Sequence, residues 1–430
     1  MKIAINPQKT QWREILKRPQ VNQQQLSEIV SQIFDEVGRD GDKAIKKYTH
    51  FFDRVDVEDL LVAQAEIDRA VNQIDGELKE AILKAKENIE IFHKAQMPEV
   101  KRIETSPGVY CWQEMRGIEK VGLYVPGGSA PLFSTVLMLA IPARIAGCEE
   151  IVLCTPPNKD GTVNPAILFA AAICGVDKVI KAGGIQAVAA LTYGTESIPQ
   201  VYKIVGPGNQ YVTAAKLYAQ LKGMAIDMPA GPSELMVVAD ESSIADFVAA
   251  DLLSQAEHGT DSQVICLLTK EKLLNPIKTA VLSQLEDLPR KSIAQEALEN
   301  ARFLVVEDFH QRIEIINEYA AEHLILAVKD PEVYVPKIKN AGSVFIGNNS
   351  PESVGDYASG TNHTLPTNGF AKAYSGVNLN TFCKQITFQE LSTEGLENIA
   401  PIVEKMAEAE GLYAHKKAVS IRVSQKVTVI

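Results

Sequence analysis

VGLYVPGGSAPLFSTVLMLAIPARIAGCEEIVLCTPP, residues 121–157, decides the fold. It combines a short β-branched strand, a glycine-rich turn, an apolar helix and a second strand. Strand-like runs continue to alternate with Ala-rich helical stretches at residues 177–184, 201–208, 234–240, 262–268, 301–307 and 342–347. Such alternation predicts parallel sheets with loops gathered at the strand ends. Eight strands over about 230 residues suit two α/β units better than one.

Helical segments flank this region on both sides. Apolar residues recur at helical spacing over residues 22–38, which predicts an amphipathic helix ending at Gly38. More helix is expected up to about residue 95, and the chain becomes helical again beyond Phe388.

The composition is that of a globular protein with two or three domains. The chain has 430 residues, of which 46% are hydrophobic and 23% charged. A formal net charge of −11 argues against nucleic acid or an anionic membrane as the main partner. Phosphates could still bind through backbone groups at helix N-termini.

Targeting signals and disulfides are not expected. The six cysteines form no CxxC pair, which indicates neither a disulfide framework nor a cysteine-based zinc site and suits a reducing cytoplasm. Met1–Thr10 has no hydrophobic region of a secretory signal. The longest apolar run, within residues 131–148, is interrupted by Pro142 and is too short to span a bilayer.

One helix has an unusual apolar face. Residues 243–259, SIADFVAADLLSQAEHG, predict a helix with Ser243 as N-cap and Gly259 after its end. Its apolar stripe is formed by Ile244, Phe247, Val248 and Leu252, and continues to Gln255 and His258. A buried face that turns polar in its last turn either satisfies an interior network or lines a site.

A Glu-His pair marks a second candidate site. His323 follows Ile313, Ile316 and Ala320 on the apolar side of a predicted helix, next to Glu322. An imidazole is the usual proton acceptor near pH 7, and an adjacent carboxylate can orient or activate water. The alternative is a hydrogen-bonded histidine of the core.

Further polar candidates lie near the C-terminus. Residues 347–369 show no helical or strand period and contain Asp356 and His363; ordered loops of this length are usually functional. His415 falls on an apolar helical stripe, and Glu410 precedes it at the junction of two helical pieces. Together, His258, His415, Asp356 and Gln255 form a mixed nitrogen and oxygen set for a divalent metal such as zinc, although no local spacing motif supports it.

Three glycine-rich loops follow predicted strands: residues 126–129, 183–184 and 206–209. Each could direct backbone N–H groups at a phosphate, but strand-to-helix turns need glycine in any case. In GPGNQY, Tyr211 replaces the third glycine of the dinucleotide fingerprint.

Several long motifs resemble histidinol dehydrogenases. These are YVPGGSAPLFSTVLMLAIPARIAGC, VGPGNQYV, DMPAGPSE, SQAEHGTDSQV, NEYAAEHL, VGDYASGTNHTLPT and AEAEGLYAHKKAV. The similarity runs in order from about residue 20 to 425, nearly the whole chain. The resemblance implies oxidation of L-histidinol to L-histidine through histidinal, with two NAD reduced, as the last step of histidine biosynthesis.

The resemblance also implies roles for individual residues. Glu322 and His323 would be the acid–base pair. Tyr124, Gln186 and Asn209 would contact NAD. The zinc ligands would be Gln255, His258, Asp356 and His415, with His415 from the other subunit of a homodimer. Substrate contacts would come from Ser233, Glu410, His323 and the four zinc ligands.

The expected fold is therefore α/β, with two Rossmann-like parallel-sheet domains, an N-terminal helical region and a small C-terminal helical tail. The expected boundaries are an N-terminal arm at 1–20, a discontinuous first domain at 21–123 and 236–377, a second domain at 124–235, and a tail at 378–430 that reaches the partner's site.

Two other functions stay open from the residues alone. A zinc hydrolase would use Glu322 to activate metal-bound water and would need no nicotinamide. A non-catalytic binding protein on the same scaffold would keep its function after loss of His323.

Overall fold

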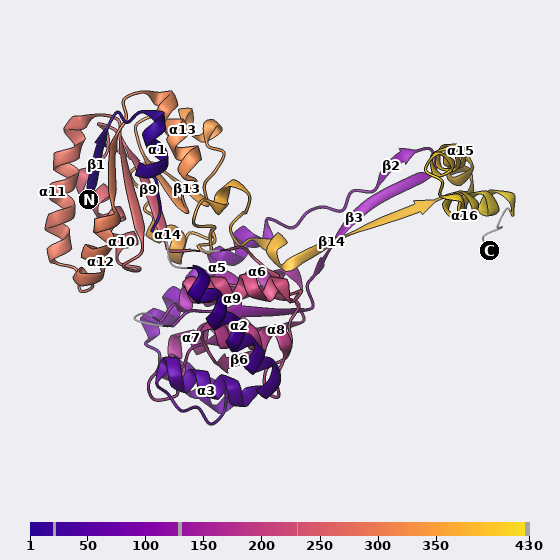
Figure 1. The fold of residues 1–430 in the computed structure, drawn as a ribbon, viewed down its shortest axis with the longest axis horizontal. Helices are drawn as coiled ribbons and strands as arrows, with labels where there is room; N and C mark the ends of the chain where they lie inside the picture. Colours follow the sequence, from indigo (N-terminus) through magenta and orange to yellow (C-terminus); the bar gives the residue numbers. More distant parts are fainter. Residues whose placement is uncertain (20–22, 128–130, 230, 426–430) are drawn as a thin grey trace. The chain divides into compact units, whose positions relative to one another are not determined.

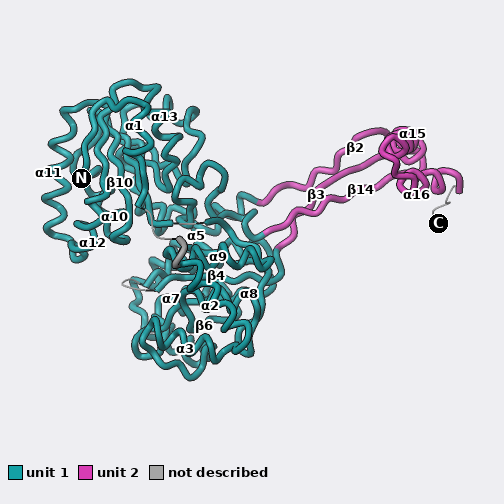
Figure 2. The backbone as a smooth tube through the Cα atoms, viewed as in Figure 1, with its two compact units in different colours: residues 1–96, 118–382 teal, residues 97–117, 383–430 magenta. Residues whose placement is uncertain are grey.

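The computed structural model describes residues 1–19, 23–127, 131–229 and 231–425. It divides into two compact units, one formed by residues 1–96 and 118–382 and the other by residues 97–117 and 383–430 (Figure 2).

A six-stranded sheet in the first unit has the order β1-β11-β10-β9-β12-β13, with every pair parallel. Its strands are β1 (Lys2–Ile5), β9 (Glu234–Ala239), β10 (Gln263–Leu268), β11 (Arg302–Val305), β12 (His323–Ala327) and β13 (Ser343–Ile346). The central strands are buried throughout, as expected for a parallel sheet covered on both faces.

Helices cover both faces of this sheet because alternate residues of each strand point to opposite sides. Leu235 and Val237 pack toward α10 (Ala245–Ala256), α11 (Leu274–Glu286) and α12 (Lys291–Ala297). Met236 packs on the other side, toward α1 (Lys9–Ile15) and α13 (Phe309–Tyr319) (Figure 1).

A five-stranded parallel sheet, also in the first unit, has the order β6-β5-β4-β7-β8. Its strands are β4 (Lys120–Tyr124), β5 (Glu150–Thr155), β6 (Lys178–Lys181), β7 (Lys203–Val205) and β8 (Ala225–Ile226). They are linked by α6 (Phe133–Ala146), α7 (Pro165–Ile173), α8 (Gly184–Tyr193) and α9 (Gln210–Leu221).

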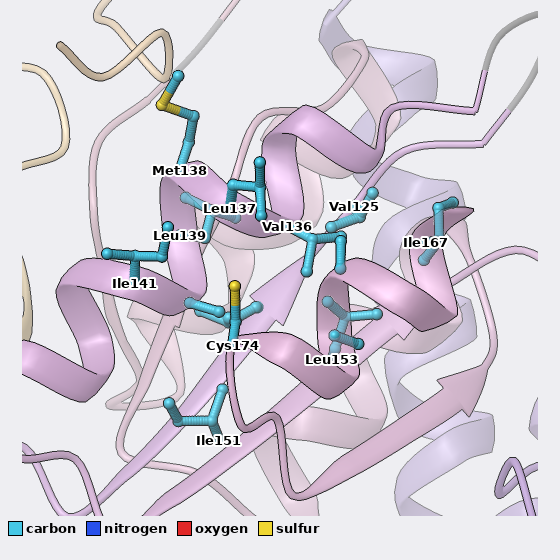
Figure 3. Packing of buried hydrophobic residues seen from close by; sticks show 14 of the residues in the cluster. Val125, Val136, Leu137, Met138, Leu139, Ile141, Ile151, Leu153, Ile167 and Cys174 are labelled. Atoms are coloured by element: carbon cyan, nitrogen blue, oxygen red, sulfur yellow. The ribbon is translucent and has the colours of Figure 1, made fainter. Parts of the chain in front are cut away.

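Both faces of the five-stranded sheet are also covered. Ile151 and Leu153 pack with α6 and α7, as the close view of this cluster shows (Figure 3). Val152 and Cys154 point to the opposite side, toward α8 and α9. The apolar helix α6 is therefore a core helix, and no helix in the described ranges is long and apolar enough to cross a membrane.

The N-terminal helices pack differently from the grouping that we predicted. They are α2 (Gln23–Asp40), α3 (Asp42–Asp53), α4 (Gln64–Gln73) and α5 (Gly76–Lys94). Their apolar faces join the two clusters of the five-stranded sheet, whereas the prediction placed residues 21–123 with 236–377. Residues 1–20 were predicted as a separate arm, but β1 pairs with β11. The division into domains as such stays a prediction.

Two predicted helix ends also differ. Helix α2 continues past Gly38 to Asp40, and the turn comes at Gly41, whose φ is +53°. Ser243 is not the N-cap of α10, because its Oγ donates to the carbonyl oxygen of Asp240 and Ile244 takes the cap position. Ile244 and Phe247, which we placed on the buried stripe, are exposed.

The second unit has an antiparallel three-stranded sheet of β2 (Ile103–Ser106), β3 (Val109–Gly117) and β14 (Cys383–Leu391). It ends in α15 (Thr393–Ala409) and α16 (Tyr413–Ser424). The two parallel sheets, the N-terminal helices and this helical tail confirm the predicted fold class.

Candidate active site

A cavity of about 360 Å³ in the first unit is lined by residues from both parallel sheets. The five-stranded sheet contributes loops at its carboxyl edge, including Gly127 after β4 and Asn209 after β7. The six-stranded sheet contributes its amino edge, with Ser233 just before β9 and His323 at the start of β12. Open α/β sheets usually bind ligands at the carboxyl edge, so the six-stranded sheet departs from that rule.

Glu322 and His323 are at this cavity, but not on a helix as we predicted. Helix α13 ends at Tyr319, and Ala320 takes a left-handed conformation with φ +53°. The turn sends the chain directly into β12, so Glu322 precedes the strand and His323 is its first residue. The apolar spacing that led from Ile316 to His323 therefore crosses from one element into the next.

Three acidic or basic side chains meet here. Glu322 Oε2 lies 3.7 Å from His323 Nδ1, and Asp356 Oδ1 lies 3.3 Å from His323 Nε2. Within the described part of the chain, neither ring nitrogen of His323 has a hydrogen-bond partner of good geometry. The imidazole is thus placed between two carboxylates with both nitrogens available.

Burial and the neighbouring charges both change the pKa values of Glu322 and His323. Burial raises the pKa of the Glu322 carboxyl to about 8. Burial alone would lower the pKa of His323, but the neighbouring carboxylates, Glu322 first, outweigh it and raise that pKa. Two groups that share protons in this way can take up and return a proton during a reaction.

Asp356 is on a short helix, α14 (Glu352–Tyr357), inside the segment that we expected to have no regular structure. His363 Nδ1 donates to the carbonyl oxygen of Asp356 (2.8 Å), and His363 Nε2 lies 3.1 Å from Thr135 Oγ1. These contacts hold the backbone of Asp356 against α6. The sequence had indicated Asp356 as a candidate metal ligand, but His363 only as a member of the same loop.

The predicted metal ligands of the first unit lie in or next to the cavity. Gln255 is in the last turn of α10 and is 1% exposed, and neither polar atom of its side chain has a partner in the described ranges. His258 comes just after that helix and lines the cavity with Asp356. Asp356 Oδ1 is likewise buried without a hydrogen bond of good geometry among these residues, and its only ionic contact there is with His323. Over the same residues, no group of three or more His, Cys, Asp or Glu side chains is arranged to hold a metal ion.

His415 and Glu410 belong to the second unit. Glu410 is the C-cap of α15, and Gly411, with φ +74°, separates it from α16, as expected for a junction of two helices. His415 is in the first turn of α16 and exposed. The predicted apolar stripe is not buried, since no described residue of α16 is buried within this chain.

A larger cavity of about 820 Å³ holds the three predicted cofactor contacts. Tyr124 ends β4 and its hydroxyl accepts a hydrogen bond from the Gly184 N–H (3.0 Å). Asn209 caps α9 through the N–H groups of Tyr211 and Val212. Gln186 Oε1 is buried and has no partner within the described part of the chain.

The glycine-rich loops form the walls of this cavity. A Cβ on Gly127 would lie 2.7 Å from Pro156, and one on Gly183 would lie 2.5 Å from the same ring. Side chains at these positions would therefore push the loops apart. Gly128 and Ser129 of the first loop lie outside the described residues.

The two cavities are neighbours. Pro126, Gly127 and Asn209 line both of them. A dinucleotide in the larger cavity could therefore present its reactive end to a small molecule beside His323.

The chain is similar to known proteins over nearly its whole length. The model of the family Histidinol dehydrogenase matches residues 16–423. The chain belongs to the histidinol dehydrogenase family. The histidinol dehydrogenase of Bacteroides thetaiotaomicron is 56% identical over 424 residues, which cover 99% of each chain. That of Vibrio vulnificus is 50% identical and covers 97% of this chain and 96% of the relative.

A solved structure gives the same result. The crystal structure of histidinol dehydrogenase from Elizabethkingia anophelis matches with a TM-score of 0.96 and 54% identity, covering 99% of this chain and 98% of that one. Family membership makes this chain an enzyme, a dehydrogenase with a small-molecule substrate.

Sequence analysis did not find several residues that support the site. Glu352, next to Asp356, is buried, and its Oε1 accepts a 2.5 Å hydrogen bond from Ser254 Oγ of α10. Arg18 binds the Glu234 carboxylate at the start of β9. Each of these residues is far in the sequence from the residue it binds. Only Glu234, an unusual polar residue at the start of the predicted strand ELMVVAD, could have been noticed from the sequence.

Proposed function

We propose that this protein carries out the zinc-dependent four-electron oxidation of L-histidinol to L-histidine through histidinal, with reduction of two NAD, as the last step of histidine biosynthesis. The observation that carries the proposal is the buried Glu322–His323 pair in a cavity that shares a wall with a second cavity of about 820 Å³. Family membership supplies the substrate.

The residues present fit a zinc ion. Gln255 and Asp356 have buried oxygen atoms without a hydrogen-bond partner in the described ranges, and His258 lines the same cavity as Asp356. A bound zinc ion would offset the free-energy cost of burying these polar atoms. Zinc usually has four ligands, so we propose His415 of a second copy as the remaining one, in a homodimer with shared sites. When bound, zinc would orient the substrate by its imidazole and amine.

The larger cavity fits NAD. Gly127 and Gly184 line it, where no side chain covers the backbone, and the side-chain amide oxygen of Gln186 is buried without a hydrogen-bond partner among the described residues. We propose Tyr124, Gln186 and Asn209 as contacts. When bound, NAD would accept the hydride.

The chemistry of the chain's own residues follows from their positions. An alcohol loses hydride only as its hydroxyl proton leaves, and His323 in its neutral form can take that proton. The resulting aldehyde must add water before its second oxidation, and Glu322 can remove a proton from that water. We propose that Ser233 and Glu410 hold the substrate and keep the aldehyde from escaping between the two oxidations. Each cycle consumes one water and two NAD.

We also propose a cytoplasmic location. None of the six cysteines, all of which lie in the described ranges, forms a disulfide bond, and four of them are buried, which suits a reducing compartment.

The test is a metal analysis combined with an NADH assay at 340 nm. We expect one zinc per subunit and two NADH per histidine. One NADH per histidinol, or no turnover by the zinc-loaded enzyme, would contradict the proposal. Ester or amide cleavage without NAD binding would favour a zinc hydrolase instead.

Shared sites have their own test. We expect His415→Ala dimers and His323→Ala dimers to be nearly inactive alone, and mixed dimers to regain activity because one of their two sites is intact. Demonstrated mixed dimers without recovery would argue against shared sites.

A further inference from the structure

Asp53 is a carboxylate in the cofactor cavity that the proposed reaction does not use. It is the last residue of α3 and lines the larger cavity with Tyr124 and Gln186. Its Oδ2 is buried and has no hydrogen-bond partner over the described ranges. Burial raises the pKa of Asp53 to about 6, and no basic group counteracts this effect.

A buried carboxylate oxygen without a donor is costly in the free protein, so its presence needs a reason. A bound ligand with hydroxyl groups would supply the missing donors. Asp56, three residues later, shows the contrast: it is 90% exposed and lies 2.8 Å from His50 Nδ1, away from the cavity lining.

The position of Asp53 indicates which part of a dinucleotide it would meet. The wall shared by the two cavities consists of Pro126, Gly127 and Asn209, and Asp53 is not part of it. The reactive end of the cofactor must lie at that shared wall, beside His323. Asp53 is therefore expected to lie beside the half of the cofactor that does not react.

We propose that Asp53 accepts hydrogen bonds from the hydroxyls of the adenosine ribose and thereby selects NAD over NADP. This inference rests on the proposed NAD-dependent function. A carboxylate is a good acceptor for the ribose 2′-hydroxyl, whereas a 2′-phosphate removes that donor and brings a second negative charge next to it. The selectivity would then come from the same group that provides affinity.

Binding to the zinc-loaded enzyme without substrate tests this directly. Isothermal titration calorimetry with Asp53→Asn should show NAD binding weakened about 10- to 100-fold, the range for a hydrogen bond to a charged group. NADP binding should not weaken, because the repulsive charge is gone. The control Asp56→Asn, which removes the same charge from the surface, should bind both cofactors as the wild type does.

A second measurement uses the wild-type enzyme and so does not depend on how any variant folds. Wild-type enzyme should bind 2′-deoxy-NAD about 10-fold or more weakly than NAD. The Asp53→Asn variant should discriminate between these two ligands much less. An unchanged ratio of NAD to NADP affinity in Asp53→Asn, or equal wild-type binding of NAD and 2′-deoxy-NAD, would overturn the inference. Failure of wild-type enzyme to bind NAD at all would instead overturn the proposed function.

Discussion

The main-chain N–H of Glu234 donates a hydrogen bond of 2.8 Å to the carboxylate of Glu322. Glu234 begins β9 and Glu322 directly precedes β12, and these two strands are neighbours in the sheet. The contact fixes one oxygen of Glu322 beside His323. The backbone of one strand thus positions the carboxylate that adjoins the next.

Removal of the imidazole should abolish most of the activity. We expect His323→Ala to lower kcat by about 10²–10⁴-fold, the usual contribution of a general base. Steady-state NADH formation measures this, with circular dichroism to verify the fold. His310→Ala, on the surface helix α13, is the control and should retain full activity. A His323→Ala enzyme with near-normal kcat would remove this residue from the mechanism.

Arg18 should be needed for stability because it neutralises Glu234. Its Nε and Nη2 bind the two oxygens of Glu234 at 2.5 and 2.8 Å, and the Glu234 side chain is only 3% exposed. Arg18→Met leaves that carboxylate buried without its cation and should lower the free energy of unfolding by about 3–5 kcal/mol. Urea unfolding measures the change.

Two variants control for the Arg18 result. Arg18→Met combined with Glu234→Gln should recover part of the stability, since no buried charge remains. Lys9→Met breaks the exposed ion pair with Glu314 and should cost no more than about 1 kcal/mol. Equal losses for Arg18→Met and Lys9→Met would contradict the argument.

Lys216 should matter for cofactor binding although it is not in the cavity. It is 2% exposed, pairs with Asp227, and donates to the carbonyl oxygen of Gly206 at 2.9 Å. Asp227 Oδ2 in turn accepts from the Gly206 N–H at 2.8 Å. Lys216→Met should loosen this loop and raise the Kd for NAD, whereas Lys222→Met at the exposed end of the same helix should not. Unchanged NAD affinity at unchanged stability would rule out the role.

Zinc affinity should depend on Gln255 and Asp356, whose buried oxygen atoms lack a hydrogen-bond partner among the described residues. Gln255→Ala and Asp356→Ala should each weaken zinc binding by at least about 10–100-fold, as measured by competition with a fluorescent chelator. Asp261→Ala, in the lining of the same cavity, is the control. Equal zinc affinity in all three variants would place the metal elsewhere.

Asp53 should make NAD binding pH-dependent. Its pKa of about 6 means that the carboxylate is ionised above pH 7 and protonated below pH 5. The Kd for NAD should thus be flat above pH 7 and rise as the pH falls through 6, and this rise should be absent in Asp53→Asn. A wild-type curve that is flat down to pH 5 would contradict it.

The raised pKa of Asp53 should also make the stability of the protein depend on pH, in the opposite direction from NAD binding. The unfolded carboxyl, with a pKa of about 3.9, releases its proton before the folded one does, so ionisation of Asp53 lowers stability as the pH rises through this interval. Asp53→Asn should therefore raise the free energy of unfolding at pH 8 relative to wild type, and have little effect at pH 4.

The sequence by itself determined the candidate residues and most of the alternating strands and helices of the two parallel sheets, but not β1 or β8. Strand–helix alternation from residue 121 onward predicted the parallel strands, because the period of apolar residues depends only on neighbours along the chain. Long motifs placed Glu322, His323 and Asp356 on the list of candidates. Local periodicity failed where an element ended early, as at Ala320, whose left-handed turn moved His323 from a helix to a strand.

Only the tertiary structure decided which residues meet. It paired Arg18 with Glu234 across 216 positions and covered the five-stranded sheet with helices of residues 23–94. It also left Asp53 Oδ2, in the cavity of about 820 Å³, without a hydrogen-bond donor among the described residues. Such contacts depend on how apolar faces from distant segments pack together, and on which buried polar groups that packing leaves unsatisfied. Neither property is encoded in the spacing of consecutive residues.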